Sequence, residues 1–75
     1  MNLLGLRYFI AISDYRSFTK ASEALYVSQP TLSRQIADLE EELGVQLFER
    51  KSREIVLTPI GELCYKEAKD IIDKC

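Results

Sequence analysis

The clearest chemical pattern in the chain begins just after Val27. Apolar residues recur at Leu32, Ile36, Leu39 and Leu43, in steps of four, three and four, which predicts a helix with one buried stripe. Pro30 and Arg34 then point away from that stripe, and hydroxyl side chains flank them. An arginine can pair with O6 and N7 of guanine, and hydroxyl groups can reach bases or phosphates. The candidate groove-facing residues are Ser28, Gln29, Pro30, Thr31, Ser33 and Arg34.

Charge is segregated along the chain. Residues 38–49 hold five acids and no base, and residues 50–53 hold three bases. The net charge of −2 and the pI of about 5.0 argue mildly against nucleic acid as a partner. A chain with this distribution can nevertheless present one basic face. Arg50 and Arg53 are therefore candidate contacts to phosphate or to the minor groove.

Each of these residues also has an ordinary structural explanation. Ser28 and Thr31 are common helix-start residues in any protein. Arg34 can pair with Asp38 one turn further along the helix. The basic residues at 50–53 can form a solvated turn. Their combination, rather than any single residue, favours a nucleic-acid surface.

Four helices and one hairpin are expected to position these residues. The predicted fold class is mainly α, a winged helix-turn-helix with a three-helix core and a two-stranded β-hairpin wing, followed by a long linker helix. Glu40, Glu41 and Glu42 lie where the helix dipole disfavours anions, and the sequence suggests no stabilising role for them. The expected elements are helices at 3–13, 18–25 (capped by Ser17), 28–43 (ended by Gly44) and 59–75 (capped by Thr58), with strands at 45–50 and 55–57 around the turn 51–54.

The inward faces follow from the same periodicity. We expect the first helix to bury Leu3, Leu6, Phe9, Ile10 and Ser13, and the second to bury Phe18, Ala21, Ala24 and Leu25. The last helix is marginal in isolation, so its apolar side should be covered by another chain or by the domain. The candidate dimerisation residues on that side are Ile60, Leu63, Cys64, Ala68, Ile71 and Ile72.

Several chemistries are improbable for these 75 residues. The chain has no histidine, the usual general base and commonest metal ligand. Cys64 and Cys75 cannot form a zinc site by themselves. They lie 11 residues apart, or roughly 16 Å along one helix, so a disulfide between them is excluded. We expect reduced thiols, with a crosslink between chains as the alternative, and we expect no catalytic residue, metal or cofactor.

Targeting signals are equally scarce. No apolar run approaches the roughly 20 residues that span a bilayer, so no membrane partner is expected. The first residues carry no basic region of the kind that opens a signal peptide. The sequence therefore predicts a cytoplasmic protein.

Nearly the whole chain resembles the N-terminal DNA-binding domain of LysR-type transcriptional regulators. The resemblance rests on the stretches at 6–9, 17–21, 27–36, 39–50 and 57–61. It implies a bacterial, nucleoid-associated regulator whose helix 28–43 enters the major groove of promoter DNA and whose wing 50–53 lies on the backbone or minor groove. It also points to Gln29, Pro30, Thr31, Ser33 and Arg34 as groove contacts and to Arg50 and Arg53 as wing contacts.

The resemblance further implies an organisation beyond these residues. It divides the chain into a DNA-binding domain at 1–58 and a dimerisation helix at 59–75 that is cut short. Family members carry a C-terminal effector-binding domain, absent from this chain, which binds the small-molecule inducer. The complete regulator is expected to be a tetramer of two homodimers. Departures from the family pattern are Gly5, the wing tip without glycine and the acid Glu54 beside it.

Two other functions are compatible with parts of this sequence. A winged helix can serve protein–protein contact, which the acidic run and low pI favour. Charge reversal at Arg34 distinguishes that function, because a protein-binding wing need not involve this face. An enzyme is disfavoured by the lack of histidine, of a metal cluster and of grouped carboxylates in an evident pocket.

Overall fold

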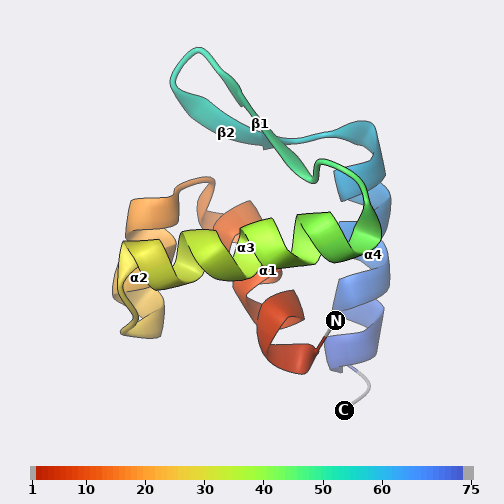
Figure 1. Cartoon of the computed structure of the whole chain (residues 1–75), viewed down its shortest axis with the longest axis horizontal. Helices are drawn as coiled ribbons and strands as arrows, with labels where there is room; N and C mark the ends of the chain where they lie inside the picture. Colours follow the sequence, from red (N-terminus) through yellow and green to blue (C-terminus); the bar gives the residue numbers. More distant parts are fainter. Residues whose placement is uncertain (1, 74–75) are drawn as a thin grey trace.

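The computed structural model describes residues 2–73 and confirms the predicted winged helix-turn-helix architecture (Figure 1). A single antiparallel hairpin is inserted between the third and the last helix of this region. The last helix is observed to Asp73, and the predicted continuation to Cys75 lies outside the described residues. The elements are α1 (Leu3–Tyr15), α2 (Phe18–Leu25), α3 (Gln29–Leu43), β1 (Phe48–Lys51), β2 (Glu54–Leu57) and α4 (Pro59–Asp73).

The helix starts are set by hydroxyl caps at the three predicted positions. The Ser17 Oγ accepts from the Lys20 amide at 3.1 Å, and the Ser28 Oγ accepts from the Thr31 amide at 3.2 Å. The Thr58 Oγ1 accepts from an amide in the first turn of α4 at 3.0 Å. Each bond satisfies an amide that has no partner inside its own helix. These three caps are therefore confirmed.

The core forms where α1 meets the other helices and β2. Its fully buried large side chains are Phe9, Ile12, Leu32 and Leu47. The Phe48 ring packs edge-on against Phe9, with 5.4 Å between ring centroids, and so joins the hairpin to this core. The predicted buried stripe of α3 is confirmed for Leu32, Ile36 and Leu39, whereas Leu43 is 37% exposed at the helix end.

The predicted inward face of α1 was wrong in part. Leu3 is 46% exposed and Ser13 is only half-buried, whereas Tyr8 and Ile12 are buried. The burial reflects packing of α1 against several elements at once, so its inward surface is broader than one stripe.

The inward face of α2 also differs from the prediction. Ala24 is exposed, and Ser22 is buried instead. The Ser22 hydroxyl donates to the Thr19 carbonyl at 2.8 Å, which satisfies the polar group inside the fold. Ala21, as predicted, is fully buried.

The hairpin pairs Phe48 with Leu57 and Lys51 with Glu54, which leaves a two-residue turn. Both turn residues have positive φ, 49° at Ser52 and 68° at Arg53. Positive φ at both positions is typical of the mirror-image turn that matches strand twist, for which asparagine and glycine are preferred. The wing therefore forms without glycine, and Ser52 and Arg53 adopt an unfavourable backbone conformation in the turn.

Backbone contacts attach the start of α4 to the loop before β1. A Cβ on Gly61 would lie 2.2 Å from the Leu47 carbonyl oxygen, so no side chain fits there. The Thr58 hydroxyl also donates to the Gln46 carbonyl at 2.6 Å. From the other side, the Glu40 Oε2 accepts from the Leu47 amide at 2.7 Å. Glu40 thus has a structural role that its position in the sequence did not suggest.

Candidate nucleic-acid interface

The predicted groove-facing residues of α3 are all exposed, and they gather at the N-terminal end of the helix. Ser33 and Arg34 are exposed between the buried residues Leu32 and Ile36, so they point outward from the stripe. The free amides and the positive end of the helix dipole lie at the same end, which favours an anion.

The hydroxyls of Ser28 and Thr31 bond to each other. The Ser28 Oγ donates to the Thr31 Oγ1 at 2.8 Å and also accepts from the Thr31 amide. These two residues therefore hold the start of α3, as the structural explanation of them predicted. The Thr31 hydroxyl proton remains able to donate outward.

Arg34 is free to bind an external group. In the region 2–73 its guanidinium has no ion pair or side-chain hydrogen bond, so the suggested pairing with Asp38 is not formed. An exposed arginine with five unused donors beside a helix N-terminus suits guanine or phosphate.

The three basic residues of the wing have different surroundings. Arg50 lies opposite the buried Ile55 and borders a hollow shared with Phe18 of α2. Lys51, one residue further, points to the opposite face of the strand. Its Nζ lies 3.7 Å from the Glu49 Oε1, so its charge is partly neutralised within the wing. Arg53 occupies the exposed tip.

The start of α3, here called its reading end, and the hairpin wing lie toward the same side of the molecule. In Figure 1 the N-terminal end of α3 and the tip of the hairpin both lie toward the left, while α4 stands at the opposite side. The elements that carry the predicted groove contacts and the predicted wing contacts therefore lie toward the same side of the molecule in this view. The acidic residues after Ala37 follow α3 away from that side.

Sequence reasoning missed exposed residues in the part of the chain just before α3. Thr19 and Lys20 lie in the first turn of α2, where helix-turn-helix proteins cross the phosphate backbone. Ser17 was interpreted only as a cap, although a basic residue three positions later was a usable signal. Tyr26, in the turn between α2 and α3, is 95% exposed.

The predicted dimerisation residues of α4 lie on two faces. Ala68 is 2% exposed, and Cys64 packs against the core of its own domain. Ala68 belongs to the hydrophobic core of its own domain, on the side where α1 packs against α4. Ile72 is half-buried. The exposed apolar residues are Ile60, Leu63 and Ile71, at 40%, 61% and 45% exposure, and Ile71 also lines a hollow with Cys64 and Ala68.

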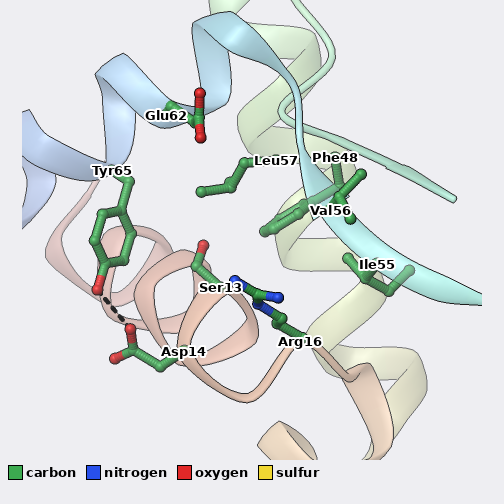
Figure 2. Close-up of a pocket in the computed structure, with 9 residues that line it drawn as sticks. All are labelled: Ser13, Asp14, Arg16, Phe48, Ile55, Val56, Leu57, Glu62 and Tyr65. Carbon is green, nitrogen blue, oxygen red and sulfur yellow. Dashed lines mark hydrogen bonds between the residues drawn. The ribbon is translucent and has the colours of Figure 1, made fainter. Parts of the chain in front are cut away.

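A separate hollow of about 560 Å³ lies between the end of α1, β2 and α4 (Figure 2). The Tyr65 hydroxyl donates to the Asp14 Oδ1 at 2.5 Å across one side of it. This hydrogen bond raises the pKa of the Tyr65 phenol, because it stabilises the protonated form; desolvation and the charge of Asp14 act in the same direction. The bond links α4 directly to α1.

Over residues 2–73, no group of three metal-ligating side chains comes together. Within the same range, no helix has the length and hydropathy needed to cross a membrane. The only cysteine of that range, Cys64, is a free thiol. The other cysteine of the predicted pair, Cys75, lies beyond the described residues.

The fold and the exposed face of α3 define a winged helix-turn-helix DNA-binding domain. Residues 3–62 match the family described as bacterial regulatory helix-turn-helix proteins, lysR family. The chain belongs to the lysR family. The resemblance stated from the sequence is confirmed.

Similar proteins are named as transcriptional regulators. BenM of Acinetobacter baylyi is 54% identical over 68 residues, which are 91% of this chain and 22% of BenM. BudR of Klebsiella aerogenes is 50% identical over 72 residues, 96% of this chain and 50% of BudR. OxyR of Escherichia coli is 44% identical over 72 residues, 96% of this chain and 24% of OxyR. The chain thus spans half or less of each relative.

Solved structures agree with the fold. The crystal structure of the BenM DNA-binding domain with catB site 1 DNA has a TM-score of 0.95 and 50% identity, covering 99% of this chain and 82% of that one. The complex with benA site 1 DNA gives the same TM-score and identity and covers 83% of that chain. These likenesses support sequence-specific DNA binding over the alternative of a protein-contact module.

Proposed function

We propose that this domain reads promoter DNA with the N-terminal half of α3 in the major groove and the hairpin on the flanking backbone or minor groove. The observation that carries the proposal is the exposed Arg34 near the start of α3, which has no side-chain partner among residues 2–73. The start of that helix and the wing tip lie toward the same side of the molecule (Figure 1). Arg34 pairs with a guanine edge, while Ser33 donates to a base or phosphate. Gln29 and Pro30 meet the groove at the helix start, whose shape Ser28 and Thr31 maintain.

Arg50 and Arg53 contact phosphate or the minor groove from the wing. Two acids, Glu49 and Glu54, lie in the wing beside its basic residues. The acids of α3 do not oppose this arrangement, because all four lie toward its far end: Asp38, Glu40, Glu41 and Glu42. That end lies about 20 Å from the helix start, given 1.5 Å per residue. This separation exceeds the Debye length of about 8 Å at physiological ionic strength. A phosphate at the start of α3 therefore meets Arg34 and is screened from the acids of the same helix.

A second copy of the chain completes the function. The domain division of the proposal is 1–58 for DNA binding and 59–75 for pairing. Three apolar residues of α4 are exposed, and their burial against an identical helix would stabilise a homodimer: Ile60, Leu63 and Ile71. Two reading helices would then meet half-sites about one turn of DNA apart or a multiple of it, as an interrupted inverted repeat.

The complete regulator is proposed to be a cytoplasmic, nucleoid-associated tetramer without enzymatic activity. Its inducer would bind in a C-terminal domain outside this chain. The small share of BenM and OxyR that the chain covers, 22% and 24%, is consistent with a longer protein.

Fluorescence anisotropy across a salt series tests the proposal. Duplexes are selected by the domain from a randomised pool, and a scrambled duplex serves as the reference. We expect Arg34→Ala to weaken binding to the selected duplex by about 1–3 kcal/mol and to relax preference at one base position.

Arg7→Ala is the matched control, because Arg7 is an exposed arginine on α1. It should leave the preference for the selected duplex unchanged. Equal losses for both variants on both duplexes would mean that Arg34 acts only through its charge. Absence of binding by the unaltered domain at low salt would overturn the DNA-binding proposal.

A further inference from the structure

We propose that Tyr26 is an additional DNA contact, which places its phenol against the sugar–phosphate backbone on the flank of α3 opposite the wing. This inference rests on the proposed function and extends it. The contact is to the backbone, and it is independent of base sequence.

Tyr26 contributes almost nothing to the fold. Its side chain is 95% exposed, far more than any other large apolar or aromatic side chain that the structure describes. Throughout residues 2–73, no hydrogen bond or ring contact involves the Tyr26 side chain. An aromatic ring left in water gains no packing energy, so the core gives no reason for a tyrosine here.

The backbone at Tyr26 also disfavours a large residue. Its φ is +58°, in the left-handed region where a side chain costs free energy and glycine does not. The conformation is imposed by the end of α2, because the Tyr26 amide donates to the Glu23 carbonyl and the Val27 amide donates to the Ser22 carbonyl. The same arrangement ends α3 at Gly44, with φ of +72°.

Tyr26 therefore occupies a position that glycine fills at the end of the next helix. The backbone at Tyr26 is strained, and its side chain makes no contact that would compensate for the strain. This combination points to a partner outside the domain. The location of Tyr26 identifies that partner. Tyr26 lies two residues before Ser28, which caps the reading end of α3.

The arrangement in Figure 1 places the turn between α2 and α3 below the start of α3 and the wing above it. A helix in the major groove, which is about 12 Å wide, is flanked by one phosphate backbone on each side. With the wing on one backbone, the Tyr26 turn faces the other. The phenol can donate one hydrogen bond to a phosphate oxygen, and its ring can pack on a deoxyribose.

Three variants test this contact by anisotropy on the selected and the scrambled duplex. Tyr26→Phe removes only the hydroxyl and should weaken binding about three- to tenfold on both duplexes. The slope of log K against log salt should not change, because the phenol is neutral. Tyr15→Phe is the matched control, since Tyr15 is another exposed tyrosine without a side-chain hydrogen bond within the described residues. Its affinity should equal that of the unaltered domain.

Tyr26→Gly separates a DNA effect from a folding effect. It removes the ring and relieves the positive φ, so its thermal unfolding midpoint should rise while its DNA affinity falls below that of Tyr26→Phe. Opposite signs in the two measurements cannot arise from unfolding.

If both Tyr26 variants bind as tightly as the unaltered domain, the Tyr26 contact is wrong and the proposed function stands. Loss confined to the selected duplex would overturn the backbone assignment. If the unaltered domain binds neither duplex, the proposed function itself fails.

Discussion

The two ends of α3 share one continuous helix and have opposite surroundings. At the N-terminal end, Ser33 and Arg34 are exposed, and their side chains make no hydrogen bond or ion pair among residues 2–73. At the C-terminal end, Leu39 is 4% exposed and Glu40 accepts from the amides that open β1. The first end is available to DNA, and the second is fixed to the hairpin and to the start of α4.

This difference explains how a small domain can orient a DNA-binding surface that it does not bury. The anchored end sets the direction of α3, so the exposed end needs few contacts of its own. The position of Glu40 is also explained. Its carboxylate accepts backbone hydrogen bonds at the end of α3 that lies away from the proposed DNA contacts. Changes at the anchored end should therefore alter stability, and changes on the reading side should alter DNA binding.

The largest expected effect lies where the start of α4 meets the loop to which the anchored end of α3 is bound. Gly61→Ala should lower the free energy of unfolding by about 3 kcal/mol, because its Cβ would meet the Leu47 carbonyl, which is backbone. Urea denaturation followed by circular dichroism measures the loss. Gly44→Ala is the control: nothing lies within 4 Å of its Cβ, and only its positive φ of 72° is strained, worth about 1 kcal/mol. A Gly61 variant no less stable than the Gly44 variant would contradict the attachment of α4 to this loop.

Glu40→Ala should cost about 1–3 kcal/mol of unfolding free energy, since it leaves the Leu47 and Phe48 amides without their carboxylate acceptor. The same denaturation experiment measures it. Glu41→Ala, one residue away and exposed, should change stability by less than about 0.5 kcal/mol. DNA affinity of the folded Glu40 variant should be unchanged. A loss of DNA affinity without a loss of stability would remove the distinction between the two ends.

Arg53→Gly should separate the two properties on the reading side. Glycine relieves the positive φ of the wing turn and should raise stability by about 1 kcal/mol. Removal of the charge should weaken DNA binding and lower the salt slope by about one phosphate contact. Arg53→Ala, which loses the charge and keeps the strain, should weaken DNA binding equally without the gain in stability. Unchanged salt dependence in both variants would show that Arg53 does not contact phosphate.

The smallest effect concerns the bond between α4 and α1. The pKa of Tyr65 is raised in the folded state by its hydrogen bond to Asp14, so the folded protein holds this proton more tightly than the unfolded chain. The resulting stabilisation is fully present below about pH 10 and is lost as the pH rises through the folded-state value. Thermal unfolding between pH 8 and pH 11 should therefore show a steeper alkaline decline for the unaltered domain than for Tyr65→Phe. Tyr15→Phe should decline like the unaltered domain, and a matching slope in Tyr65→Phe would exclude this bond as the cause.

The sequence by itself determined the type and order of the elements and the exposed face of α3. It placed the first strand at 45–50 and the turn at 51–54, whereas the strands are Phe48–Lys51 and Glu54–Leu57, because the register of the hairpin pairs Lys51 with Glu54. The caps at Ser17, Ser28 and Thr58 were predictable because each is a bond between residues three positions apart. The exposed face of α3 followed from the spacing of Leu32, Ile36 and Leu39, since helix periodicity is a local property. The family resemblance rested on the same contiguous segments.

Only the tertiary structure decided which surfaces those elements bury. Ser22 is buried instead of the predicted Ala24, and Ala68 lies in the core. Gly61 lies against the Leu47 carbonyl. Each of these contacts depends on the angle between packed elements. The role of Glu40 and the bond from Tyr65 to Asp14 join residues that no short pattern connects. The exposure of Tyr26 likewise depends on how α2 and α3 cross. Local hydrogen bonds and helix periodicity depend on residues a few positions apart, so they could be predicted from the sequence. Packing depends on residues that are distant in the sequence, so it could not.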